Sequence, residues 1–150
     1  MALEDFVKNH EVLAVGCRSD IAWSKVCEAH SFLPKNTVRM TPTEAEILKY
    51  YSNTFNALRI IFANAMYELS EKLNCDYKII LETFLMRGTS TPDYLSCSPS
   101  LRGYGGMCLP KDVQAMASLF KNLDLPFDIF NTIDSDNSKL LKTIFEGMRD

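Results

Sequence analysis

The sequence predicts a mainly helical protein in which a short βαβ unit precedes one long helix. Three observations indicate this fold class. The stretch from Thr43 to Asn74 contains neither proline nor glycine, residues 11–16 form a short apolar run, and apolar residues recur at helical spacing toward the C-terminus. The chain has 150 residues, which is close to the usual size of one domain.

The N-terminal part of the chain predicts two strands and a connecting helix. Glu11–Gly16 reads as a first strand and Thr37–Met40 as a second. Between them, apolar residues at helical spacing predict a helix from Asp20 to about residue 32, capped by Ser19 or Asp20. Together these segments predict a small βαβ unit.

The segment from Thr43 to Asn74 predicts a helix that is long for a globular domain. Thr43 and Glu46 have the spacing of a capping box, in which the side chain of each residue bonds the backbone of the other. At ~1.5 Å per residue the helix is roughly 45 Å long. It is apolar around most of its circumference, which is typical of an interior helix. Its apolar residues are Ile47, Leu48, Tyr51, Phe55, Leu58, Ile61, Phe62, Met66 and Leu69.

A narrow polar seam, formed by Lys49, Asn53 and Asn56, runs along this helix. Lys49 and Asn53 are four residues apart, so they share a face and can converge on one point. Two other interpretations remain open for this pair: a solvated stripe, or a lysine whose alkyl chain covers apolar surface beside a helix-bending asparagine.

Three further helices are predicted after the long one. They run from Tyr77 to about Met86, from about Pro110 to Lys121, and from about Phe127 to Gly147. The loop between the first and second of these helices carries several prolines and most of the glycines, which do not favour regular structure.

That loop contains the candidate for a reactive group, in the stretch Gly103-Tyr104-Gly105-Gly106-Met107-Cys108-Leu109-Pro110-Lys111-Asp112. The glycines allow close approach of a ligand to the backbone, and Pro110 favours the first turn of a helix. Cys108 therefore lies just before a helix N-terminus, whose dipole favours a thiolate. Lys111 adds positive charge, and Asp112 supplies a carboxylate able to handle a proton or orient a water. The alternative is a glycine turn that happens to hold a buried cysteine.

Composition excludes several classes of protein. The hydrophobic content of 47% and charged content of 23% are ordinary for a soluble globular protein, and a net charge of −3 gives no footprint for nucleic acid or an anionic membrane. The sequence lacks both a run of eighteen apolar residues and a secretion signal. Five scattered cysteines without a C-x-x-C pair indicate a reducing cytosol, so we expect a cytoplasmic protein with no disulfide framework and no metal site.

Two other kinds of site are weighed against this pattern. A Cys–His hydrolase needs His10 or His30 near Cys108 in space, which spacing alone does not decide. The acidic run Asp134–Asn137 lacks the glycine and the glutamate of a calcium-binding loop, so we interpret it as a solvated patch.

Two segments of the chain resemble the UDP-glucose/GDP-mannose dehydrogenase family. Glu46–Ile60 is similar to the central helix of that family, with its Lys-x-x-x-Asn pair, and Gly103–Asp112 is similar to its loop of the form Gly-aromatic-Gly-Gly-x-Cys-x-Pro-Lys-Asp. The resemblance extends from about Glu4 to the C-terminus. It implies that residues 42–150 form the central helical dimerisation domain, which carries the catalytic-cysteine loop, and that residues 1–41 are a remnant of a Rossmann-like α/β cofactor domain.

The resemblance also implies an activity, the NAD-dependent oxidation of the C6 alcohol of a UDP-glucose-like nucleotide sugar to a carboxylate. By this resemblance Cys108 is the catalytic nucleophile, Lys49 and Asn53 donate toward the developing oxyanion, and Asp112 positions or deprotonates the water. The implied substrate-binding residues are Gly103, Tyr104, Gly105, Gly106 and Lys111, with Arg87 reaching the substrate across a dimer.

Departures from the family pattern limit what the resemblance implies. The sequence has no G-x-G-x-x-G after a strand and no acidic residue about twenty positions beyond one, so no residue is assigned to NAD, and a separate NAD-binding domain is an expected partner. Arg87-Gly88 matches only part of the family's Arg-Ile-Gly, and Ala65 stands where the family usually has Glu. We expect a homodimer built on the Thr43–Asn74 helix. The alternative function is a non-catalytic dimerisation or nucleotide-sugar-binding module.

Overall fold

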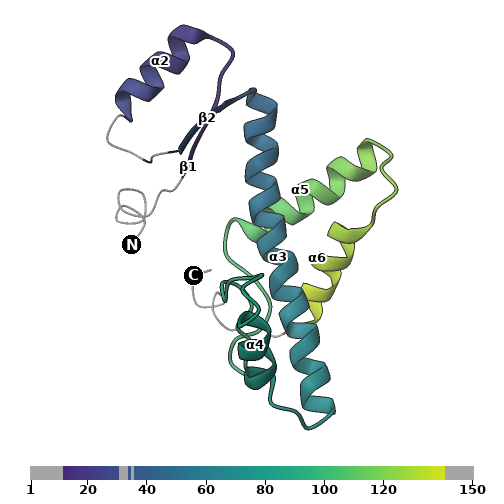
Figure 1. The fold of residues 1–150 in the computed structure, drawn as a ribbon. Coiled ribbons are helices and arrows are strands. Elements are labelled where there is room, and N and C mark those ends of the chain that lie inside the picture. The colour runs from purple at the N-terminus through teal and green to yellow at the C-terminus, as the bar shows by residue number, and fades with distance from the viewer. Residues whose placement is uncertain (1–11, 31–33, 35, 141–150) are drawn as a thin grey trace. The chain divides into compact units, whose positions relative to one another are not determined.

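The computed structural model describes residues 12–30, 34 and 36–140 of the chain (Figure 1). The chain divides into two compact units, Met1–Lys49 and Tyr50–Asp150, and the division falls inside the long helix α3 (Pro42–Lys72). Five helices and two strands lie within the described ranges, so the predicted mainly helical class is confirmed.

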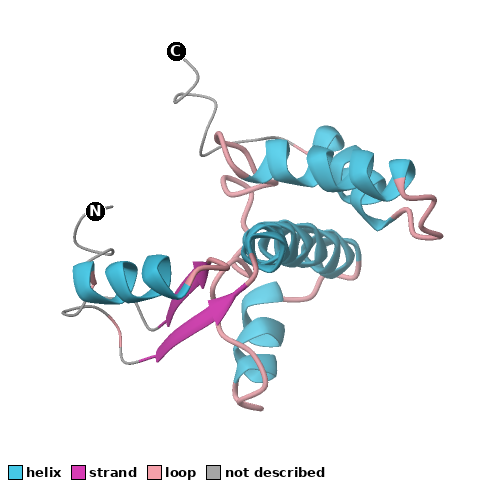
Figure 2. Ribbon diagram, turned by 90° about the horizontal axis from the view of Figure 1, so that it is seen from above, coloured by secondary structure: helices cyan, strands magenta, loops and turns pink. Residues whose placement is uncertain are grey.

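The N-terminal unit contains the predicted βαβ arrangement. Strands β1 (Val12–Gly16) and β2 (Asn36–Met40) pair in parallel, with Val12 opposite Asn36 and Gly16 opposite Met40. Helix α2 (Asp20–Ala29) connects them and lies alongside the two strands (Figure 2). The cap of α2 is Ser19, whose hydroxyl accepts the N–H of Ala22 at 3.4 Å. Residues 31–33, where the predicted end of α2 fell, lie outside the described residues.

The capping box of α3 is formed by Thr41 and Glu44, so the prediction of Thr43 and Glu46 is wrong. The helix begins at Pro42: the Thr41 N–H donates to Glu44 Oε2 at 2.6 Å, and the Glu44 N–H donates to Thr41 Oγ1 at 3.3 Å. Hydrogen bonds to the Glu44 carboxylate, from the Thr41 backbone first and from the Thr41 side chain second, lower the pKa of this carboxyl. Thr41 and Thr43 both stand three residues before a glutamate, and Pro42 decides between them because proline favours the first helical position.

The other helices agree with their predicted positions. Helix α4 spans Tyr77–Leu85, α5 spans Leu109–Asn122 and α6 spans Ile129–Lys139. The last helix was predicted to reach Gly147, but residues 141–150 lie outside the described part of the chain. Helices α5 and α6 pack against each other as a hairpin (Figure 1), with the rings of Phe120 and Phe130 edge to face at 4.8 Å.

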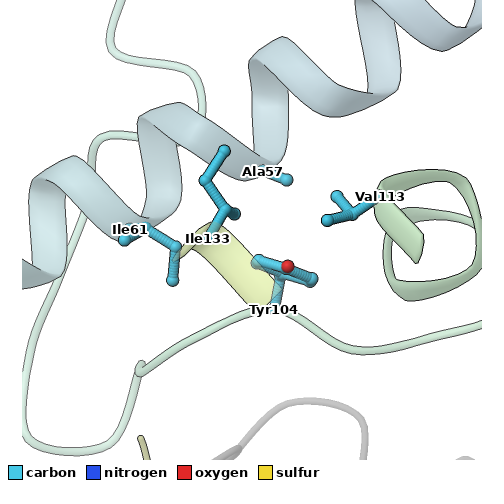
Figure 3. Close-up of a cluster of buried hydrophobic side chains, with 5 residues drawn as sticks. All are labelled: Ala57, Ile61, Tyr104, Val113 and Ile133. Carbon is cyan, nitrogen blue, oxygen red and sulfur yellow. The ribbon is translucent and has the colours of Figure 1, made fainter. Parts of the chain in front are cut away.

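Two clusters of buried side chains hold the C-terminal unit together. We call residues 103–108, which directly precede α5, the glycine loop. In the first cluster, side chains of α3, α5, α6 and the glycine loop point toward one another (Figure 3); they are Ala57, Ile61, Tyr104, Val113 and Ile133. The second lies between α3, α4 and the following loop, and consists of Ala63, Tyr67, Tyr77 and Leu95. The first cluster fixes the start of α5, and with it Cys108, against the middle of α3.

Helix α3 nevertheless exposes part of its apolar surface. Tyr51, Phe55, Phe62 and Leu69 are exposed by 68, 50, 57 and 49% and share one face of the helix; we call these four residues the apolar stripe. Two other apolar residues of the helix are partly buried: Leu58 packs against the first cluster and Met66 against the second. None of the helices in the described part of the chain is long and apolar enough to cross a membrane.

Candidate functional site

A pocket of about 510 Å³ lies between α3 and the glycine loop of the C-terminal unit. The loop that precedes α5 forms much of its wall, and α3 contributes polar and apolar side chains. The lining residues are Asn53, Ile60, Asn64, Tyr94, Ser96, Leu101, Gly103, Tyr104, Gly105, Gly106, Met107, Cys108 and Leu109. The pocket therefore brings together segments about fifty residues apart in sequence, including the two segments that carry the candidate residues.

Cys108 lies at the position predicted for it, directly before a helix. It is the N-cap residue of α5, its side chain makes no capping hydrogen bond, and Pro110 lies in the first turn. Cys108 is exposed and lines the pocket, which excludes the alternative of a buried core cysteine.

Asp112, four residues after Cys108, is hydrogen-bonded to Asn53. Asp112 is 0% exposed and lies one turn after Cys108 on α5, so the two side chains share a face. Asn53 Nδ2 on α3 donates to Asp112 Oδ2 at 2.5 Å, and Lys111 Nζ lies 2.6 Å from Asp112 Oδ1. An amide nitrogen carries two hydrogens, so Asn53 can bond Asp112 and donate a second hydrogen bond. A buried carboxylate with two partners is a fixed acceptor rather than a solvated side chain.

The other predicted polar residues lie on exposed positions. Lys49 is exposed on α3, four residues before Asn53 and therefore on the same helix face. Arg87 follows the end of α4 and is exposed, and it does not line the pocket. Within the described ranges, no group of three or more histidine, cysteine or acidic side chains has the arrangement to hold a metal ion.

Two backbone N–H groups of the glycine loop donate hydrogen bonds to asparagine side chains. The Tyr104 N–H donates to Asn137 Oδ1 at 2.7 Å, and Asn137 Nδ2 donates to the Tyr104 carbonyl at 2.9 Å. The Gly103 N–H donates to Asn64 Oδ1 at 3.4 Å. Gly105 and Gly106 also line the pocket, and their amides make no hydrogen bond to another described residue.

The interpretation of residues 134–137 as a solvated patch is wrong for Asn137, which is only 1% exposed. Its partner is backbone 33 residues earlier in the chain, so no local pattern marks it.

Sequence reasoning also missed a polar network at the middle of α3. Arg102, which directly precedes the loop, donates from Nε to Asn64 Oδ1 at 2.8 Å and pairs through Nη2 with Glu68. Its guanidinium lies over the Tyr67 ring, 4.9 Å from the centroid. Asn64 and Glu68 are four residues apart, which is the one sequence signal that they share a face. The helix middle therefore keeps a carboxylate–arginine pair although Ala65 stands where the family usually has Glu.

The Tyr104 side chain points into the core of the C-terminal unit. Its ring belongs to the first buried cluster, and its hydroxyl is buried without a hydrogen-bond partner among the described residues. Burial is the main cause that raises the pKa of this phenol well above its usual range, and the charge of Asp134 adds to it. Tyr104 therefore contributes backbone, not side chain, to the pocket wall.

Replacing Tyr104 with Phe is expected to raise the free energy of unfolding by about 1 kcal/mol, because it removes a buried hydroxyl that has no partner. Urea denaturation of both proteins measures the difference. The matched control is Tyr77→Phe, which removes a hydroxyl that donates to the Leu95 carbonyl at 2.7 Å and is expected to lower stability by about the same amount. A loss of stability in Tyr104→Phe as large as in the control would show that the Tyr104 hydroxyl has a partner, such as a buried water.

Fold and site together define a helical domain that presents an exposed thiol at a helix N-terminus, one turn before a buried carboxylate that accepts a hydrogen bond from a partly buried amide. Residues 43–139 match the model of the UDP-glucose/GDP-mannose dehydrogenase family, central domain. The chain therefore belongs to this family and contains its central domain.

Individual relatives agree with this assignment. UDP-glucose 6-dehydrogenase of Rickettsia bellii is 29% identical over 152 residues, covering 99% of this chain and 32% of that protein. GDP-mannose 6-dehydrogenase of Pseudomonas aeruginosa is 24% identical over 119 residues, covering 79% of this chain and 27% of that protein. A solved UDP-glucose dehydrogenase from the archaeon Pyrobaculum islandicum superposes with a TM-score of 0.84 at 30% identity, over 92% of this chain and 31% of that one. The chain spans about a third of the length of these relatives.

Proposed function

We propose that this chain supplies the catalytic thiol of a nucleotide-sugar 6-dehydrogenase, a UDP-glucose 6-dehydrogenase by its relatives. The observation that carries the proposal is the exposed Cys108 at the start of α5, with Asp112 buried one turn below it and bonded to Asn53. These three side chains are the types that nucleophilic catalysis at a carbonyl needs: a nucleophile, a hydrogen-bond donor for the oxyanion, and a carboxylate for water.

In the proposed reaction the Cys108 thiolate attacks the carbonyl carbon of a C6 aldehyde. A sulfur–carbon bond forms, and the electron pair of the carbonyl moves to its oxygen. Asn53, through its second N–H, and Lys49 donate to that oxygen and stabilise its charge. The carbon then loses its hydrogen as a hydride to an acceptor that a separate domain would hold, and the electron pair on oxygen re-forms the carbonyl, which leaves a thioester. Attack by water breaks the sulfur–carbon bond of this thioester and releases the carboxylic acid and the thiol. Asp112 orients that water or accepts its proton.

The family resemblance implies NAD as the hydride acceptor, but the residues of this chain do not fit a dinucleotide site. The turn after β1 reads Gly16-Cys17-Arg18-Ser19, which lacks the glycine pattern that lets a helix N-terminus approach a pyrophosphate. The proposal therefore gives the βαβ unit no part in hydride transfer, and a separate NAD-binding domain is the proposed partner.

The sugar is proposed to bind at the glycine loop. Gly105 and Gly106 line the same pocket as Cys108 and have amides without a partner among the described residues, and the ammonium of Lys111 lies beside Asp112. Gly103 and Tyr104 shape the loop rather than donate to the sugar, because asparagine side chains already bond their amides. Arg87 is proposed to reach the substrate of a second copy of the chain.

The proposed homodimer is built on the apolar stripe of α3. Four large side chains on one face of a helix, each about half exposed or more, form a patch that water solvates poorly and that a partner can cover. A twofold axis lets such a patch cover itself, and cyclic dimers are the commonest closed assemblies.

Iodoacetamide labelling tests the proposed nucleophile. Cys108 is expected to be alkylated faster at pH 7 than the other four cysteines, because it alone is exposed and is itself the N-cap residue of a helix. Cys97 is expected to be slow, since burial raises the pKa of its thiol. Peptide mass spectrometry after timed labelling gives the five rates.

Cys75 is the internal comparison in this experiment, because it is exposed and lies one residue before Asp76, the N-cap of α4. The carboxylate of Asp76 already accepts the Lys78 N–H at 2.8 Å, so this helix terminus is occupied by an acidic side chain, whereas Cys108 is itself the N-cap of α5. Equal rates for Cys75 and Cys108 would mean that exposure alone sets reactivity. That result would favour the alternative of a non-catalytic module over the proposed enzyme.

A further inference from the structure

The residue that holds the glycine loop most completely is Asn137, on α6. Its side chain is 1% exposed, and its amide bonds both the N–H and the carbonyl of Tyr104, at 2.7 and 2.9 Å. An asparagine amide that accepts from and donates to the same residue reproduces the two-bond pattern of an antiparallel backbone pair. The position and the orientation of the Tyr104 backbone are therefore both fixed, four residues before Cys108.

Gly103 shows how closely the loop approaches this asparagine. A Cβ on Gly103 would lie 2.7 Å from Asn137 Oδ1, and the residue has φ +63°, a conformation that favours glycine. Gly106, two residues before Cys108, has φ +73° as well. A loop with two glycines at positive φ has many alternative conformations, so its single arrangement needs contacts from outside the loop.

We infer that Asn137 is a positioning residue for Cys108: through the Tyr104 backbone it sets the direction in which the loop delivers the thiol to the start of α5. This inference rests on the proposed function only in taking Cys108 as the reactive group. Asn64 and Arg102 anchor the loop on its other side, to α3, through the bonds of Asn64 Oδ1 to Arg102 Nε and to the Gly103 N–H. Asn137 anchors the loop to α6. The loop residue that it bonds, Tyr104, is closer to Cys108 in sequence than Gly103, which Asn64 bonds.

The test compares Asn137→Ala and Asn137→Asp with a control on the same helix, Asn131→Ala. Asn131 is exposed, and among the described residues its side chain bonds Asp128 at 2.6 Å and no residue of the glycine loop, so its replacement should leave the loop untouched. Asn137→Asp keeps the size of the side chain and the acceptor for the Tyr104 N–H, but it loses the donor to the Tyr104 carbonyl. The readout is the ratio of the alkylation rates of Cys108 and Cys75, measured between pH 6 and pH 9 on the whole chain.

Both Asn137 variants are expected to lower the Cys108/Cys75 ratio at pH 7 about fivefold, and to move the pH profile of Cys108 labelling upward, because the thiol loses its fixed place at the helix N-terminus. The control should keep the wild-type ratio. Gly103→Ala provides an independent route to the same effect, since its new methyl group displaces the Asn137 amide. Circular dichroism establishes that each variant remains folded under the labelling conditions.

The outcomes separate this inference from the proposed function. If wild-type Cys108 reacts no faster than Cys75, the proposed nucleophile fails, whatever the variants do. If wild-type Cys108 reacts faster and folded Asn137→Asp keeps the wild-type ratio and pH profile, Asn137 is purely structural and the inference is overturned. Unfolding of Asn137→Ala leaves the decision to Asn137→Asp and Gly103→Ala.

Discussion

Replacing Phe62 with Asp is expected to convert a dimer of the chain into a folded monomer. Phe62 is 57% exposed in the single chain, so a charge at this position costs little in the monomer. At the centre of a dimer built on the apolar stripe, the same carboxylate is buried without a partner, which costs several kcal/mol. Light scattering at tens of micromolar is expected to give twice the mass of one chain for the wild type and the mass of one chain for the variant.

Two controls give this experiment its meaning. Glu71→Lys changes the charge of an exposed residue of α3 outside the apolar stripe, and it should leave the dimer intact. Leu58→Asp, in contrast to Phe62→Asp, should unfold the chain, because Leu58 packs against the first buried cluster. If the wild-type chain is a stable monomer at this concentration, the dimerisation role must be dropped.

Replacing Cys108 with Ser is expected to lower acid formation by about 10³-fold or more, because a neutral hydroxyl is a far weaker nucleophile than a thiolate at neutral pH. The measurement is NADH formed from UDP-glucose and NAD by the assembled enzyme, by which we mean this chain supplemented with the NAD-binding and nucleotide-binding domains of a relative. The chain alone is expected to form no NADH, since it lacks the pyrophosphate-binding glycine pattern.

Cys75→Ser is the matched control, because Cys75 is also an exposed thiol but does not line the pocket. It should keep the wild-type rate. A Cys108→Ser enzyme within tenfold of the wild type would contradict covalent catalysis by this residue.

Elements specified by local patterns could be predicted from the sequence. The absence of proline and glycine over residues 43–74 marks α3 to within two residues at its C-terminal end, and Pro110 after Cys108 marks the start of α5. The error in the capping box was also local, since Thr41 and Thr43 fit the same spacing and only the preference of Pro42 for the first helical position separates them.

Contacts between distant segments could not be predicted in this way. The bonds of Asn137 to Tyr104 and of Arg102 to Asn64 join residues 33 and 38 positions apart, and neither asparagine belongs to a sequence pattern that names its partner. The burial of Asp112 likewise follows from packing of α5 against α3, which a single sequence does not reveal. The sequence thus singles out Cys108 as the candidate nucleophile, whereas the structure shows the contacts that hold the loop before it.

The most direct test of Cys108 as the nucleophile is the mass of the Cys108 peptide after the assembled enzyme is quenched in acid during turnover. We expect a fraction of this peptide to carry the sugar acid as a thioester, to lose it on treatment with hydroxylamine, and to lack it when NAD is omitted. Formation of acid with Cys108 unmodified at every time point, at a rate unchanged in Cys108→Ser, would contradict the assignment.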